Sequence, residues 1–124
     1  MVIIFLKKWL PAILWAGMIF FISSIPHLKS NLPDIWDLIF RKFAHAGEFA
    51  VLAVLIKRGF QESKNEKSDF LKTFLIVFLY AVFDETHQHF VAGRVASALD
   101  VIIDSLGALI SLIAFYKQKA VSKQ

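Results

Sequence analysis

The sequence predicts an all-α fold: an integral membrane four-helix transmembrane bundle with both termini in the cytoplasm. Hydrophobic residues make up 57% of the 124 residues, whereas soluble domains contain about 45–50% apolar residues. They gather into four segments separated by polar connections, and membrane-spanning helices have this pattern. A chain of this length forms a single domain, residues 1–124.

Charge and cysteine content narrow the classes of function. The net charge is +4, but Lys and Arg lie mainly beside the apolar segments, as in membrane proteins. We therefore expect the lipid bilayer as a partner and no nucleic acid. The chain has no cysteine, which excludes disulfide bonds, thiol catalysis and thiolate metal sites.

The first two helices are predicted at about residues 9–25 and 35–56. The run 9–25 carries no charge and follows Lys7 and Lys8. A signal peptide is the competing interpretation, but the run is longer than a signal core of about 7–15 residues. The second segment carries charge only before Phe49, so one end is wet, lines a cavity or has polar partners. The charged connection 57–69 is expected to be a solvated loop without chemistry.

The third and fourth helices are predicted at about residues 70–90 and 98–116. The apolar part of the third segment is too short to span alone, so this helix must carry Asp84, Glu85 and Gln88 at membrane depth. The fourth segment has polar residues at its start and a basic tail after its end. Polar side chains therefore lie near one end of three helices.

The distribution of Lys and Arg predicts the orientation. In a four-helix arrangement, both termini and the middle connection share one side, which holds all but four of the 14 Lys and Arg residues. The other side has Lys29, Arg41, Lys42 and Arg94. Because cytoplasmic loops are enriched in Lys and Arg, we expect a multi-pass protein of the cell membrane with both termini inside. The polar helix ends then meet at the outer face.

Helical spacing places these polar residues on shared faces. Arg41, His45 and Glu48 follow one another at spacings of four and three, and Asp84 precedes Gln88 by four. A further stripe begins the fourth helix: Ser97, Asp100, Asp104, Gly107 and Ser111. Gly107 and Ser111 are expected to allow a neighbouring helix to approach closely.

The same residues give the chain a resemblance to the VanZ-like family, small membrane proteins named after a protein associated with resistance to the glycopeptide antibiotic teicoplanin. The resemblance covers nearly the whole chain. It rests on the pattern D-E-x-x-Q-x-F-x-x-G-R-x-x-S-x-x-D, and on Lys42, His45 and Glu48. The chain departs from the family pattern at Phe49, Ala92 and Asp104. The resemblance implies a role in antibiotic response more readily than it implies a mechanism.

Two classes of function follow for the outer-face site. As an enzyme, it would use Glu85 and Asp84 as general acid and base, with His45 as a proton shuttle. Arg94 would hold an anionic group of a phosphate-bearing lipid or cell-wall intermediate. Further substrate contacts would come from Lys42, Glu48, Gln88, Asp100 and Asp104. As a non-enzymatic membrane module, the same cavity would bind a lipid head group or a lipidated antibiotic.

Structural interpretations of these residues stay open. Buried ion pairs can serve only to hold helices in register, and Arg94 can form a bridge to Asp84, Glu85 or Asp100. Ser97 and Asp100 fit the helix-capping pattern S-x-x-D.

A metal site also stays open. His45 with Glu48, or Glu85 with His89, has the spacing of a chelating pair for magnesium, manganese or zinc. The sequence therefore assigns no particular metal or cofactor. Gly93 is expected in a turn.

Overall fold

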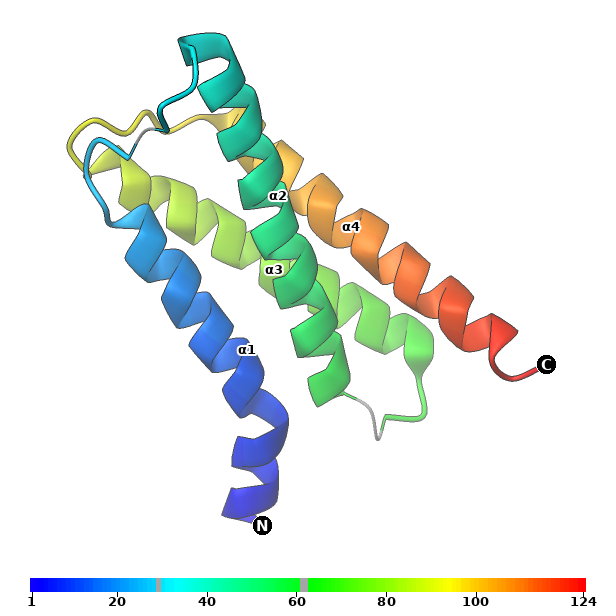
Figure 1. The fold of residues 1–124 in the computed structure, drawn as a ribbon. Coiled ribbons are helices and arrows are strands. Elements are labelled where there is room, and N and C mark those ends of the chain that lie inside the picture. Colours follow the sequence, from blue (N-terminus) through cyan, green and yellow to red (C-terminus); the bar gives the residue numbers. More distant parts are fainter. Residues whose placement is uncertain (29, 61–62) are drawn as a thin grey trace.

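Four helices make up the fold. The computed structural model describes residues 1–28, 30–60 and 63–124; Lys29, counted above on the outer side, lies outside the described residues. Within them the chain forms α1 (Val2–Ser23), α2 (Asp34–Gly59), α3 (Glu66–His89) and α4 (Ala98–Val121), and no strand (Figure 1). The predicted all-α fold with four helices is confirmed. Each helix extends beyond its predicted range at one end or both.

Two connections lie together at one end of the molecule. Figure 1 shows the α1–α2 and α3–α4 connections at the top, with the N-terminus and the α2–α3 connection at the bottom. The His27 N–H donates a hydrogen bond of 3.1 Å to the Ala92 carbonyl and so joins the two upper connections. The next residue, Gly93, has a φ of 74°, a left-handed conformation that favours glycine. Its predicted place in a turn is confirmed.

The close approach predicted at Gly107 is confirmed in the contact between α2 and α4. A Cβ atom on Gly107 would lie 2.4 Å from the Ala46 carbonyl oxygen of α2. Since a backbone atom cannot rotate aside, a larger residue here would push the two helices apart. Ser111 contributes differently, because its hydroxyl bonds the Ala108 carbonyl of its own helix at 2.8 Å.

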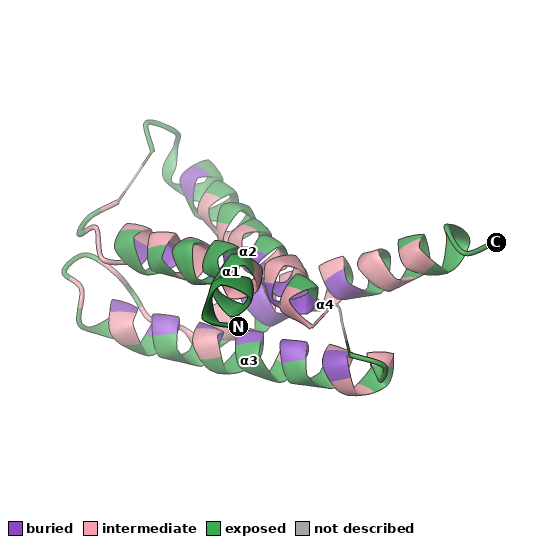
Figure 2. Ribbon diagram, turned by 90° about the horizontal axis from the view of Figure 1, so that it is seen from below, coloured by how far each residue is buried: buried purple, intermediate pink, exposed green. Residues whose placement is uncertain are grey.

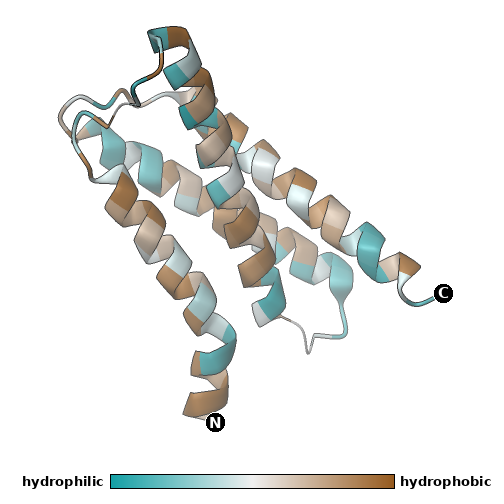
Figure 3. Ribbon diagram, viewed as in Figure 1, coloured by the Kyte–Doolittle hydropathy of each residue, from teal (hydrophilic) through white to brown (hydrophobic). Residues whose placement is uncertain are grey.

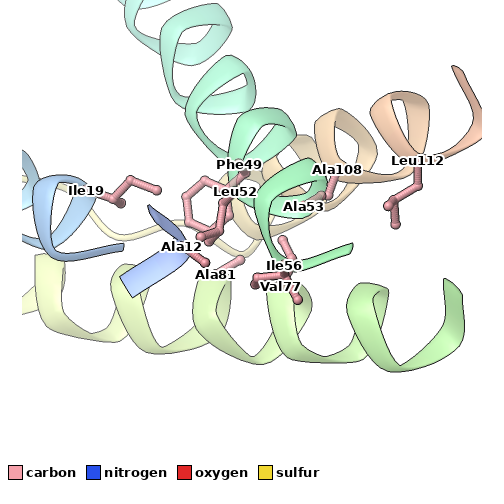
Figure 4. Packing of buried hydrophobic residues seen from close by; sticks show 10 residues of the cluster. All are labelled: Ala12, Ile19, Phe49, Leu52, Ala53, Ile56, Val77, Ala81, Ala108 and Leu112. Carbon is pink, nitrogen blue, oxygen red and sulfur yellow. The ribbon is translucent and has the colours of Figure 1, made fainter. Parts of the chain in front are cut away.

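The buried apolar core is small and lies around α2, which packs against each of the other helices (Figure 4). Its residues are Ala12, Ile19, Phe49, Leu52, Ala53, Ile56, Val77, Ala81, Ala108 and Leu112. Two side-chain hydrogen bonds fasten α1 beside this core. Trp15 Nε1 donates to the Glu48 carbonyl of α2 at 2.9 Å, and the Tyr80 hydroxyl of α3 donates to the Ala16 carbonyl at 2.6 Å.

Polar side chains are as common inside the molecule as apolar ones. The buried polar residues are Ser23, Asp37, Lys57, Asp69, Thr73, Asp84, Glu85, Gln88, Asp104 and Ser105. Large apolar side chains are instead exposed on all four helices, among them Phe21, Phe43, Leu71 and Ile110 (Figures 2 and 3). Extensive exposed apolar surface marks a face that meets lipid or another protein. Among the described residues, α1 and α4 are long and apolar enough to cross a membrane.

The solvated loop expected at 57–69 is shorter in the structure, because α2 continues to Gly59 and α3 begins at Glu66; residues 63–65 between them are exposed. Lys57 and Asp69 both lie in helices, where their side chains are 3% and 1% exposed. Lys57 Nζ lies 3.5 Å from Asp69 Oδ2 and 5.5 Å from the centre of the Tyr116 ring. For Lys57 and Asp69 the expectation was wrong, because a dense run of charged residues is solvated only where no neighbouring helix covers it.

Candidate functional site

His45 lies at the centre of a polar cluster contributed by three helices. Its Nδ1 atom is 2.9 Å from Asp104 Oδ2 on α4, and its Nε2 atom is 3.4 Å from Asp84 Oδ2 on α3. Glu48, one turn further along α2, places its Oε2 4.0 Å from His45 Nε2. The structure thus brings together predicted site residues that lie far apart in the sequence.

Ser23 of α1 completes this cluster, and the sequence analysis did not assign it to the site. Its hydroxyl donates to Asp84 Oδ2 at 3.0 Å. Gln88 Nε2 donates to the same carboxylate oxygen at 3.0 Å and to Ser23 Oγ at 3.3 Å, and lies 3.2 Å from His45 Nε2. The available signal was a serine near the end of the uncharged run 9–25.

Three carboxylate oxygens of this cluster are buried without a hydrogen-bond partner among the described residues. They are Glu48 Oε2, Asp84 Oδ1 and Asp104 Oδ1. Buried carboxylate oxygens are normally hydrogen-bonded. These three oxygens can therefore accept further hydrogen bonds, in addition to the contacts that hold the helices together.

Glu85 and Asp84 have different partners and do not form a close acid pair. Glu85 Oε1 accepts a hydrogen bond of 2.6 Å from the Ser97 N–H at the start of α4, whereas Asp84 faces Ser23 and His45. Consecutive residues of a helix point in directions about 100° apart, so they meet different neighbours.

Ser97 caps α4 as predicted, but Asp100 does not complete a capping box. Ser97 Oγ accepts a hydrogen bond of 3.2 Å from the Leu99 N–H. In a capping box, the acid three residues later would bind the Ser97 N–H. Glu85 of α3 binds that N–H instead, and the Asp100 carboxylate pairs with Lys42 of α2.

Arg94 does not form the carboxylate bridge considered above. Its Nε and Nη2 atoms donate to the Ile25 and Ile22 carbonyls at 3.2 and 2.9 Å, at the end of α1. The last carbonyls of a helix lack partners within the helix, so a cation is well placed there. Burial, followed by the charge of Arg41, lowers the pKa of Arg94, although an arginine keeps its charge in proteins.

A cavity of about 440 Å³ opens among these groups at the end where the upper connections meet. It is lined by Leu38, Arg41, Lys42, His45, Glu85, Gln88, Gly93, Arg94, Val95, Ser97, Asp100, Ile103 and Asp104. This volume is within the about 300–1,000 Å³ usual for small-molecule sites. Most predicted site residues line it; Glu48 lines a neighbouring cavity, and Asp84 is fully buried behind His45 and Gln88.

The described residues contain no group of three His, Asp or Glu side chains arranged to hold a metal ion. In the first predicted chelating pair, His45 faces Asp104 and Asp84 more closely than Glu48. In the second, the His89 ring packs on Phe90, with 5.4 Å between the ring centres.

These features define the class as a helical protein with two helices long and apolar enough to span a membrane and an acid–histidine cluster beside a polar cavity. The model of the VanZ/LLP1 family matches residues 6–119, and the chain belongs to this family. The match covers nearly the whole chain and confirms the resemblance drawn from the sequence. No curated protein and no solved structure matches the chain.

Proposed function

We propose that this chain is a multi-pass protein of the cell membrane with four spanning helices and both termini in the cytoplasm. Its polar site acts at the outer face on a phosphate-bearing lipid or cell-wall intermediate, and so contributes to the response to glycopeptide antibiotics such as teicoplanin. The observation that carries the proposal is the cavity of about 440 Å³, where carboxylates, cations and His45 meet. The family membership supports the link to the antibiotic.

The contacts of His45 and Glu85 suit general acid–base catalysis. Asp104 binds Nδ1 of His45 and so fixes the orientation of a ring that lines the cavity. Asp84 is fully buried and acts through His45 and Gln88, which makes it a positioning residue. Glu85 also lines the cavity, with one oxygen held by Ser97. Lys42 and Arg94 supply positive charge for an anionic group.

The membrane arrangement can be tested by labelling, because the chain has no cysteine of its own. Single cysteines replace Ala92, exposed in the upper connections, and Ser122, exposed after α4. A membrane-impermeant maleimide applied to whole cells is expected to label Ala92→Cys. It should label Ser122→Cys only after permeabilisation. The reverse pattern would place the cavity in the cytoplasm and remove the proposed substrate.

The catalytic role of Glu85 predicts a large loss of function in Glu85→Gln without loss of folded protein. The glutamine oxygen can still accept from the Ser97 N–H, so the cap on α4 is kept. Loss of general acid–base catalysis costs about 10²–10⁴-fold in rate. We expect cells that express Glu85→Gln to show the teicoplanin susceptibility of cells without the protein, at an equal amount in the membrane. Glu66→Gln, the same change at the opposite end, serves as the matched control and should retain function.

A non-enzymatic lipid-binding module is the second candidate, favoured by a smaller cavity beside the polar one, to which Ile22, Leu28, Phe40 and Ala44 contribute apolar side chains. In this case Glu85→Gln keeps its function and Arg94→Ala loses it. Because Arg94 also binds two carbonyls of α1, the comparison is made at equal amounts of folded protein. A purely structural cluster gives a third pattern, in which both variants lower the amount of folded protein in the membrane.

A further inference from the structure

A second cavity, of about 250 Å³, adjoins the polar cavity between the end of α1 and the first half of α2. It is lined by Ile22, Leu28, Ser30, Phe40, Arg41, Ala44, His45, Glu48 and Arg94. It is smaller than the usual site for a whole small molecule. It can therefore hold only part of a larger ligand.

The two cavities share a wall and differ in chemistry on either side of it. Arg41, His45 and Arg94 line both cavities. Beyond them, five of the ten further residues that line the larger cavity are charged or amide residues, namely Lys42, Glu85, Gln88, Asp100 and Asp104, and Leu38, Val95 and Ile103 add apolar surface. The smaller cavity has the apolar side chains of Ile22, Leu28, Phe40 and Ala44, with Ser30 and Glu48 as its further polar residues. This arrangement suits an amphipathic molecule. Its polar part would lie in the larger cavity, its apolar part in the smaller one, and an anionic group between the two parts would meet the shared cationic residues.

The two arginines at the boundary retain donors for such an anion. Arg94 uses Nε and Nη2 for the α1 carbonyls, so its Nη1 is left for other contacts. Arg41 Nε lies 2.9 Å from Asp37 Oδ2 as an ion pair, with a geometry that leaves this nitrogen without a hydrogen-bond partner among the described residues. The guanidinium group binds phosphate well because its donors match the oxygen geometry. Two neighbouring cations also repel until an anion lies between them.

We propose that the two cavities form one site for a phospholipid, with the phosphate between Arg41 and Arg94. The head group beyond the phosphate occupies the larger cavity, and the first part of an acyl chain occupies the smaller one. The remainder of the chain continues into the bilayer along the exposed apolar surface. This inference rests on the proposed function. It adds the class of ligand and the orientation of that ligand across the two cavities.

Binding to the purified protein in detergent micelles tests the inference. The probes are dioleoyl phosphatidylglycerol, its short-chain dibutyryl homologue and glycerol 3-phosphate. We expect the wild-type protein to bind the dioleoyl lipid at least 10-fold more tightly than the dibutyryl lipid. Ala44→Phe, which fills the smaller cavity, should abolish that preference and change binding of the dibutyryl lipid by less than twofold. Leu28→Trp fills the same cavity from the connection and replaces Ala44→Phe if that variant does not fold.

The matched control is Ala114→Phe, the same change on an exposed position of α4 outside both cavities, and it should bind as the wild type does. A preference for the long chain that survives both cavity-filling variants would overturn the inference. So would binding of glycerol 3-phosphate as tight as that of the dioleoyl lipid, because the ligand would then be a free phosphate compound. If the wild-type protein binds none of the three probes, the inference fails, whereas the proposed function is decided separately by Glu85→Gln, because it also covers a cell-wall intermediate.

Discussion

Replacing Asp84 with alanine is expected to lower the free energy of unfolding by about 3–5 kcal/mol, the cost of removing one partner from a buried charge cluster. The side chain is fully buried. Its Oδ2 atom accepts from Ser23 and Gln88 and faces His45, so it joins α1, α3 and α2 at one point. Alanine would remove the acceptor that Ser23 and Gln88 share and leave His45 with Asp104 as its nearest carboxylate partner. Unfolding of the purified protein in detergent, followed by tryptophan fluorescence, measures the loss.

One further variant separates charge from shape at this position, and a second variant on the same helix serves as its control. Asp84→Asn keeps an oxygen that can accept from Ser23 and Gln88, so it should lose less than half as much stability as alanine. Thr86→Ala is the control on the same helix, since its exposed hydroxyl bonds only the Val82 carbonyl one turn back, and it should unfold like the wild type. A loss below 1 kcal/mol for Asp84→Ala would show that the Ser23–Asp84–His45 contacts do not hold the helices together.

The sequence allowed prediction of the faces that form the site, because helical spacing decides which side chains lie together. His45 and Glu48 share one face of α2, and Asp84 bonds Gln88 one turn later, as the spacing required. Gly107 also lies where a small residue was expected, against the backbone of α2. These features follow from local geometry within each helix and from the polarity of single residues.

Partners across helices could not be predicted in the same way. Arg94 binds backbone carbonyls of α1, and every residue offers a carbonyl, so no pattern of side chains points to this contact. Ser23 lies 61 residues from Asp84, in a helix that carries few other polar groups. Glu85 was expected to act with Asp84, although adjacent helical positions face different neighbours.

Lys57 and Asp69 were misread for a related reason. The composition of 57–69 is that of a solvated connection, yet helices cover both charges. Each charge lies where the helix dipole favours it, with Lys57 in the last turn of α2 and Asp69 in the first turn of α3. Burial at a helix end depends on how neighbouring helices pack, and composition does not report this.

Loss of either partner of the Lys57–Asp69 pair is expected to cost about 3–5 kcal/mol of stability, whereas loss of both should cost little or stabilise the protein. The charges lie 3.5 Å apart, but both carboxylate oxygens of Asp69 lack a hydrogen-bond partner among the described residues. Removing two charges from water costs free energy. Because no aligned hydrogen bond contributes here, the attraction between the two charges must offset that cost alone. Lys57→Met leaves Asp69 buried and alone, and Asp69→Leu leaves Lys57 in the same state. The double variant fills the space with apolar groups.

Unfolding of the two single variants and the double variant in detergent gives the coupling energy of the pair. Lys119→Met is the control at the same end of the molecule. It removes an ion pair with Glu66 whose side chains are 39% and 42% exposed, and exposed pairs contribute little to stability. If the double variant is as unstable as the worse single variant, the buried pair itself stabilises the fold. The end of the molecule opposite the polar cavity would then depend on charge as strongly as the proposed site does.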